Sequence, residues 1–190
     1  MSKSSPITEG LRVLIKYFEE HNIPYVVVGG IAVLIYGRSR FTNDIDIIID
    51  HNRLDRKDFI NYLTEKNFDV RLEDLEGLNL KEHCSIFFSE YQFRVDLKGK
   101  YSEKEEYTLK TAIITRFNDI ELKVASPIST IVYKLVFGSE QDYEDALAVY
   151  VRNKEKINME ILMQEAKKRG VHKKLKKLVE EVDKFLENEK

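Results

Sequence analysis

One segment, residues 25–50, constrains the fold of this 190-residue chain more than any other. It begins with Tyr25–Val28, an apolar run of residues that favour strands, and continues with a glycine pair, Gly29 and Gly30, that leads into a short apolar stretch. Aspartate then alternates with isoleucine within residues 43–49. Alternation with a period of two is typical of a strand, and glycine after an apolar run is typical of a turn. The segment therefore predicts a strand, a glycine turn, a short helix and a second strand.

The alternation in the second strand separates two kinds of side chain. Successive strand residues point to opposite faces, so Asp44 and Asp46 share one face, and Ile45, Ile47 and Ile49 share the other. Residues two apart on a strand are about 6.6 Å apart at Cα, which lets two carboxylates lean toward one divalent ion. Mg²⁺ prefers oxygen ligands and usually binds one or two carboxylates together with substrate phosphates. The acid pair therefore predicts a magnesium site.

The glycine pair predicts a phosphate site next to this metal. Glycine allows the backbone to approach a ligand closely, and the N–H groups that open a helix favour an anion. Gly29 and Gly30 stand where the first strand ends and the short helix begins. One segment thus offers both a metal platform and a phosphate cradle.

Taken together, these motifs resemble the nucleotidyltransferase superfamily that includes DNA polymerase beta, CCA-adding enzymes and the minimal nucleotidyltransferases. The shared pattern is a strand, Gly-Gly, a short helix and then R-x-T-x-D-I-D-I. The matching residues are Gly29, Gly30, Arg40, Thr42, Asp44 and Asp46. Within the superfamily the chain is most similar to the prokaryotic AbiEii-like group, known largely from toxin–antitoxin systems. The resemblance implies an α+β fold: a nucleotidyltransferase-like mixed β-sheet flanked by helices, with a C-terminal helical extension.

A second acidic position lies in a predicted hairpin over residues 84–97, with a turn at Ser89-Glu90-Tyr91. Alternate apolar residues of its second arm share one face, which puts Arg94 and Asp96 on the other. Asp96 could be a surface acid paired with Arg94 or Lys98. The resemblance implies instead that Asp96 is the third carboxylate of the superfamily, which a later strand supplies.

The resemblance also implies roles for the matching residues. Asp44, Asp46 and Asp96 would bind Mg²⁺ or Mn²⁺ as the catalytic and metal-binding set, and Asp96 would help to deprotonate the acceptor. Gly29 and Gly30 would place N–H groups at the β- and γ-phosphates.

Three further residues belong to the predicted nucleotide site. Arg40 and Lys134 would add positive charge at the triphosphate, and Thr42 would support the loop. For Lys134, a lysine simply exposed on a helix is the alternative.

The rest of the chain predicts mostly helices. Ser5-Pro6 or Thr8 starts an amphipathic helix that Asn22 and Pro24 stop, and Ser126-Pro127 starts another. The polar residues 73–81 predict a loop. Residues 109–116 and 120–125 predict a strand pair at the sheet edge. We expect a catalytic core over residues 1–125 and a C-terminal helical region over residues 126–190 that packs on it.

Composition narrows the class of protein. The net charge of −2 argues against nucleic-acid binding by bulk charge, and no apolar run approaches the length of a membrane-spanning helix. The N-terminus lacks a signal-peptide core, and the single Cys84 cannot form an internal disulfide. A cytoplasmic protein is expected. The scattered histidines and the lone cysteine make a thiol enzyme a poor alternative.

These observations predict a metal-dependent nucleotidyltransferase that moves a nucleoside monophosphate from a triphosphate to an acceptor hydroxyl. The acceptor would be RNA, with tRNA as one case, or a protein, and a cognate antitoxin or toxin would be a partner. Seven Lys or Arg residues between 167 and 177 could contact nucleic acid or form a solvated face. Two alternatives stay open: a protein-AMPylating antitoxin-type enzyme, and a non-enzymatic nucleotide-binding module of the same fold.

Overall fold

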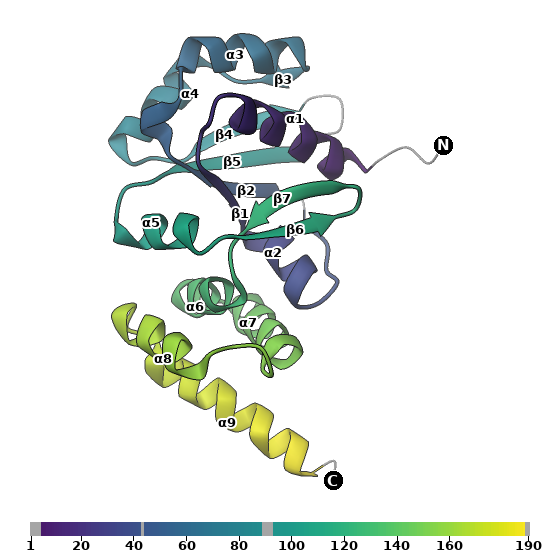
Figure 1. Cartoon of the computed structure of the whole chain (residues 1–190), viewed down its shortest axis with the longest axis vertical. Helices are drawn as coiled ribbons and strands as arrows, with labels where there is room; N and C mark the ends of the chain where they lie inside the picture. Colours follow the sequence, from purple (N-terminus) through teal and green to yellow (C-terminus); the bar gives the residue numbers. More distant parts are fainter. Residues whose placement is uncertain (1–4, 43, 89–92, 189–190) are drawn as a thin grey trace. The chain divides into compact units, whose positions relative to one another are not determined.

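The computed structural model describes residues 5–42, 44–88 and 93–188. The chain divides into two compact units (Figure 1). The first, the sheet unit, comprises Met1–Ile31 and Phe41–Val124, and the second, the helical unit, comprises Ala32–Arg40 and Ala125–Lys190. The packing of residues 126–190 on a core formed by residues 1–125 stays a prediction.

The sheet unit is built on a seven-stranded mixed sheet in the order β3-β4-β5-β2-β1-β7-β6 (Figure 1). Its strands are β1 (Tyr25–Val28), β2 (Asp44–Ile49), β3 (Phe68–Asp69), β4 (Cys84–Phe88), β5 (Phe93–Gly99), β6 (Ile113–Phe117) and β7 (Ile120–Val124). The pairs β2–β5 and β1–β7 are parallel, and the other neighbouring strands are antiparallel. The mixed sheet with flanking helices confirms the predicted fold class.

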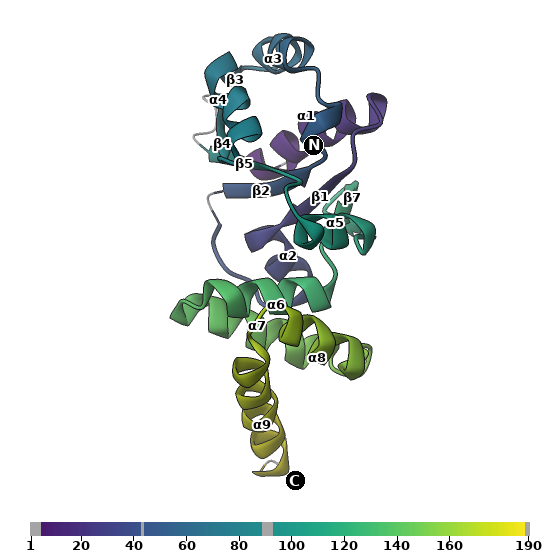
Figure 2. The same ribbon diagram turned by 90° about the vertical axis from the view of Figure 1, so that its left-hand side faces the viewer.

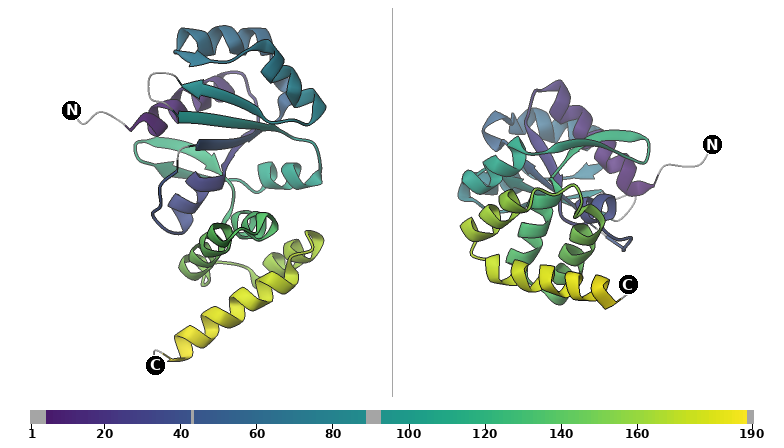
Figure 3. Two further views of the ribbon diagram at one scale, coloured as in Figure 1. Left: turned by 180° about the vertical axis from the view of Figure 1, so that it is seen from behind. Right: turned by 60° about the horizontal axis from the view of Figure 1, so that its bottom comes forward.

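Helices cover both faces of this sheet. They are α1 (Pro6–Glu20), α3 (Arg56–Glu65), α4 (Leu72–Glu76) and α5 (Glu103–Lys110), with 3₁₀ turns at His51–Arg53 and Gly77–Leu80. As predicted, α1 begins after Ser5, whose hydroxyl accepts a hydrogen bond from the Thr8 N–H. The buried Phe18 of α1 packs against Tyr25 on the apolar face of the sheet. The opposite face is contacted by α5, which can be followed in Figure 3.

Two predictions for this unit were wrong in detail. The predicted loop over residues 73–81 contains α4 and a 3₁₀ turn, because Leu75 and Leu78 are buried. The strand predicted from residue 109 begins only at Ile113, and α5 precedes it. The missed signal was the Ser-x-x-Glu sequence at Ser102, a pattern that often opens a helix.

The hairpin predicted over residues 84–97 is confirmed as β4 and β5. Its proposed turn, Ser89-Glu90-Tyr91, lies outside the described residues. Along β5 the apolar residues Phe93, Val95 and Leu97 are buried, so the predicted inward face is correct.

The helical unit contains α6 (Pro127–Phe137), α7 (Glu140–Asn153), α8 (Met159–Lys168) and α9 (His172–Asn188), together with most of α2 (Gly29–Tyr36). Figure 2 shows α6 and α7 side by side. Ser126 caps α6 and Pro127 occupies its first turn, as predicted. Apolar side chains from all of these helices, such as Val33, Leu135, Val149 and Leu175, form one buried core. Within the described residues, no helix is long and apolar enough to cross a membrane.

Candidate active site

The sheet register brings the three predicted acids together. Asp46 on β2 lies directly opposite Asp96 on the parallel strand β5. Neighbouring strands are about 4.8 Å apart, and paired residues of parallel strands point to the same side. Asp44 precedes Asp46 by two residues and therefore lies on the same side. We call the surface formed by Asp44, Asp46 and Asp96 the acid face.

Neighbouring hydroxyl groups orient two of these carboxylates. Ser85, opposite Asp96 on β4, donates a hydrogen bond of 2.6 Å from Oγ to Asp96 Oδ1. Thr42 donates from Oγ1 to Asp44 Oδ1 at 3.0 Å. Thr42 is buried, and this hydrogen bond joins it to the first residue of β2. In each acid one carboxylate oxygen therefore accepts a hydrogen bond from a hydroxyl group of the chain itself.

A cation bridges the same two acids. Arg94 Nη2 lies 2.9 Å from Asp96 Oδ2 and 3.6 Å from Asp44 Oδ2. The ion pair between Asp96 and Arg94, which the sequence offered as the alternative to a metal-binding role, is therefore present. Asp96 lies on the acid face all the same. The Arg94 side chain is 46% exposed. Its contact with Asp44 follows from the β2–β5 register, in which the two residues are opposite each other.

Gly29 is required where the glycine pair meets the acid face. Its φ is +62°, a conformation that side-chain-bearing residues rarely adopt. A Cβ at this position would also overlap the carboxylate of Asp46. Glycine thus lets the first turn of α2 lie against an acid of the acid face. The binding of phosphate by Gly29 and Gly30 stays a prediction.

The donor atoms of the acid face suit a divalent cation. Carboxylate oxygens are the ligands that Mg²⁺ and Mn²⁺ prefer. Asp44 and Asp96 both contact one positive group, the Arg94 guanidinium. Among the described residues, no three His, Cys, Asp or Glu side chains converge as a metal-binding group. The metal-binding role of the three acids stays a prediction.

The two predicted phosphate-binding cations lie together in the helical unit. Lys134 Nζ is 3.0 Å and Arg40 Nε is 3.2 Å from Asp145 Oδ2, and Arg38 Nε is 3.1 Å from Asp145 Oδ1. Lys134 Nζ also lies 2.8 Å from Asp142 Oδ1. The Asp145 side chain is 0% exposed. We call Arg38, Arg40 and Lys134 around Asp145 the cation cluster.

The cation cluster differs from the sequence-based description of its members. Lys134 is buried, so the alternative of a lysine simply exposed on a helix is wrong. Burial raises the pKa of the Asp142 carboxyl, but hydrogen bonds from Lys134 and Ser139 outweigh it and hold the pKa below its ordinary value. Arg38 and the ion pairs of Asp145 with these cations were missed. The three-residue spacing of Asp142 and Asp145 on one helix was the available signal.

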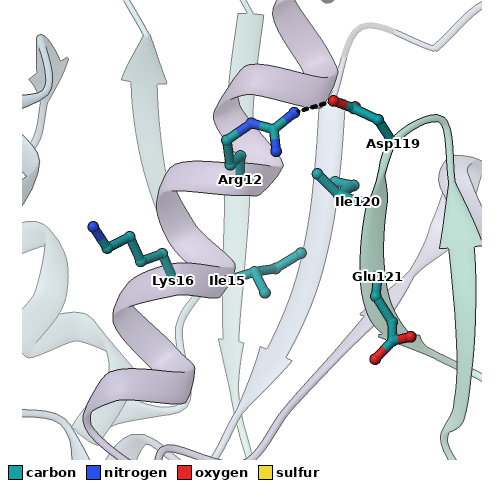
Figure 4. A pocket seen from close by; sticks show the side chains of 6 residues that line it. All are labelled: Arg12, Ile15, Lys16, Asp119, Ile120 and Glu121. Atoms are coloured by element: carbon teal, nitrogen blue, oxygen red, sulfur yellow. Dashed lines mark hydrogen bonds and ion pairs between the residues drawn. The ribbon is translucent and has the colours of Figure 1, made fainter.

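Two cavities lie outside the acid face. One, of about 270 Å³, lies in the sheet unit between α1 and the β6–β7 hairpin, where Arg12 and Asp119 form an ion pair of 2.8 Å (Figure 4). None of the predicted site residues lines it. The other, of about 360 Å³, lies in the helical unit and is lined in part by Lys134, Lys174 and Lys177.

Cys84 is not placed to act as a nucleophile. The residue is fully buried on β4, and burial raises the pKa of its thiol to about 12. A thiolate is therefore rare at neutral pH, and the thiolate is the reactive form. The structure supports the sequence-based rejection of a thiol enzyme.

Comparisons with known proteins agree on one superfamily. The model of a family described as "Nucleotidyltransferase of unknown function (DUF6036)" matches residues 5–188. No curated protein sequence matches the chain significantly.

Several solved structures resemble the chain. A nucleotidyltransferase-like protein from Paracoccidioides brasiliensis is 18% identical with a TM-score of 0.56, over 91% of this chain and 87% of its own. The antibiotic-resistance factor ANT(2'')-Ia is 10% identical with a TM-score of 0.55, over 89% and 96%. The lincosamide antibiotic adenylyltransferase LnuA is 17% identical with a TM-score of 0.50, over 74% and 94%. At these identities the similarity shows a shared fold.

Proposed function

Because this chain belongs to the DUF6036 family of nucleotidyltransferases, we propose that it transfers a nucleoside monophosphate from a nucleoside triphosphate to an acceptor hydroxyl. The observation that carries the proposal is the acid face. Asp46 and Asp96 are opposite each other in the sheet, and Asp44 lies on the same side. Such a group of carboxylates fits metal-assisted displacement at phosphorus.

In this proposal Asp44, Asp46 and Asp96 bind Mg²⁺ or Mn²⁺ together with the triphosphate. When held there, such a cation would offset the charge that develops on the attacking and leaving oxygens. The N–H groups of Gly29 and Gly30 bind phosphate oxygens at the start of α2. Thr42 keeps the Asp44 carboxylate oriented through its hydrogen bond to Oδ1.

The chemical step breaks one bond and forms one. The acceptor oxygen forms a bond to the α-phosphorus, the bond to the oxygen that bridges to the β-phosphate breaks, and pyrophosphate leaves with that electron pair. Asp96 takes the proton of the acceptor hydroxyl. Ser85 fixes the orientation of Asp96 by donating to its other oxygen. The predicted contact of Arg40 and Lys134 with the triphosphate stays a prediction, since both residues already pair with Asp145.

We propose RNA, such as a tRNA end, as the acceptor. On α9, Lys173, Lys176 and Lys177 are exposed, and no described side chain forms an ion pair with them. Exposed lysines grouped on one helix attract a phosphate backbone. In contrast, Lys168 and Arg169 pair with Glu165, so part of the basic segment is already neutralised. An AbiEii-like role with a cognate antitoxin belongs to the same proposal.

A transfer assay tests the function directly. The protein is incubated with each labelled nucleoside triphosphate, Mg²⁺ and a panel of RNA, protein and small hydroxylated acceptors. We expect labelled RNA, and we expect Asp44→Asn and Asp96→Asn to lower the transfer rate by at least about 100-fold. The matched control is Asp119→Asn, an exposed acid at the β6–β7 hairpin that is not part of the acid face.

The outcomes separate the alternatives. If a protein of the panel becomes labelled instead of RNA, the acceptor is a protein, and this result favours the AMPylating alternative. Transfer that survives Asp44→Asn unchanged would remove the acid face from the mechanism. Nucleotide binding without transfer to any acceptor of the panel would favour the non-enzymatic module.

A further inference from the structure

Arg94 covers the carboxylate oxygens that a metal ion would need. In Asp96, Oδ1 accepts the Ser85 hydroxyl and Oδ2 faces the Arg94 guanidinium. In Asp44, Oδ1 accepts the Thr42 hydroxyl and Oδ2 faces the same guanidinium nitrogen. On both acids, the oxygen that makes no hydrogen bond to a hydroxyl group is therefore the one that Arg94 contacts.

The Arg94 guanidinium and a divalent cation would compete for the same two Oδ2 atoms. Both are positive, and both need the Oδ2 lone pairs of Asp44 and Asp96. The Arg94 side chain is 46% exposed and can turn into solvent, which breaks its contact with the Asp96 carboxylate, whose side chain is 16% exposed. The Arg94–Asp44 pair is exposed on both sides, and such pairs are weak and exchange readily.

We propose that Arg94 is the resident counter-ion of the acid face and couples metal binding to nucleotide binding. A metal ion alone must displace the guanidinium and therefore binds weakly. When a triphosphate arrives with the metal, the displaced guanidinium pairs with its phosphates, because arginine presents several N–H donors suited to phosphate oxygens. This inference rests on the proposed function, since it assumes that metal and triphosphate meet at the acid face.

A neighbouring lysine provides a matched control. Lys98 follows Asp96 by two residues on β5 and so points to the same side of the sheet. Its Nζ lies 2.9 Å from Glu105 on α5, and no ion pair between Lys98 and the acid face is found among the described residues. Removing its charge tests whether any nearby positive group would have the same effect.

The experiment measures Mn²⁺ affinity by electron paramagnetic resonance of the unbound ion. Each protein is titrated alone and with a saturating triphosphate analogue that has a non-hydrolysable α–β bridge. We expect weak Mn²⁺ binding by the wild type alone and much tighter binding with the analogue. Arg94→Gln should bind Mn²⁺ alone about five-fold more tightly and gain less from the analogue. Arg94→Lys should restore most of the coupling, and Lys98→Gln should behave as the wild type.

Failure of this inference differs from failure of the proposed function. If the wild type shows strong coupling that Arg94→Gln leaves unchanged, Arg94 is not the counter-ion and the inference is overturned while the function stands. If Arg94→Gln and Lys98→Gln tighten Mn²⁺ binding equally, the effect is one of general charge and the inference is again overturned. A wild type that binds Mn²⁺ in neither condition overturns both.

Discussion

The acid face and the cation cluster are both built from carboxylates and basic side chains, but in opposite arrangements. On the acid face, one cation, Arg94, contacts two acids: Asp44, whose side chain is 38% exposed, and Asp96, whose side chain is 16% exposed. In the cation cluster, three cations surround Asp145, whose side chain is 0% exposed. Exposed ion pairs are weak and exchangeable, whereas removing one partner of a buried pair leaves an uncompensated charge. The comparison teaches that the acid face can exchange its cation, while the cation cluster fixes local structure.

The largest expected effect comes from removing the buried acid. Asp145→Asn should lower the free energy of unfolding by about 3–5 kcal/mol, because three cations lose their shared partner. Urea unfolding measures this change. Glu144→Gln is the control: Glu144 pairs with Arg38 but is half exposed, so its loss should cost less than about 1 kcal/mol. Equal losses in the two variants would remove the distinction between the regions.

Removing an exposed acid of the acid face should change stability little and activity strongly. Asp44→Asn should change the free energy of unfolding by less than about 1 kcal/mol, since its ion pair is exposed and its loss also relieves repulsion among the acids. The same variant should lose at least about 100-fold in transfer rate. Measuring unfolding and transfer on one preparation checks both. A variant that loses both together would make Asp44 a structural residue.

Lowering the pH should destabilise both units, because each contains one carboxyl group whose pKa is held down by a neighbouring lysine. Hydrogen bonds from Lys134 and Ser139 hold the Asp142 pKa below its ordinary value against the effect of burial, and Ser102 and Lys98 do the same for Glu105. A folded-state pKa below the unfolded one stabilises the fold at neutral pH, and this stabilisation is lost as pH falls through the carboxyl range.

The measurement is urea unfolding at a series of pH values below 7. Lys134→Met and Lys98→Gln should each reduce the dependence of stability on pH. Lys174→Met should leave it unchanged, because Lys174 Nζ donates to the Leu135 carbonyl, a group that does not titrate. An unchanged pH dependence in all three variants would show that these pairs contribute nothing.

The smallest effect concerns the buried thiol of the sheet unit. Burial raises the pKa of Cys84 to about 12, so a thiol reagent such as DTNB should not react at about pH 8 until the protein unfolds. Asp44→Asn should leave Cys84 equally unreactive toward DTNB, because the acid face contributes little to the stability of the strands beneath it. Rapid labelling of that variant would show that the acid face stabilises the strands beneath it.

The sequence predicted the parts of the structure that depend on local pattern. The strand–glycine–helix–strand segment, the caps at Ser5 and Ser126 and the inward face of β5 all follow from short-range periodicity or turn chemistry. The position of Asp96 opposite Asp46 was reached through the resemblance, because pairing between distant strands leaves no local signal.

Contacts between segments distant in sequence could not be predicted. Arg94 meets Asp44 only because β2 and β5 pair in one register out of many, and a pattern within either strand does not fix that register. Likewise Arg40 and Asp145 are separated by about a hundred residues, and no period or spacing connects them. The helix α5 is a different case, since a local signal for it, the Ser-x-x-Glu sequence at Ser102, is present in the sequence.

Diffraction from crystals grown with Mn²⁺ and a non-hydrolysable triphosphate tests the central claim most directly, because anomalous scattering locates the metal. We predict a Mn²⁺ ion ligated by Asp44, Asp46 and Asp96, with phosphate oxygens in the same shell and the Arg94 guanidinium turned away from both Oδ2 atoms. A bound triphosphate whose metal lies elsewhere, with Arg94 still bridging Asp44 and Asp96, would contradict the account.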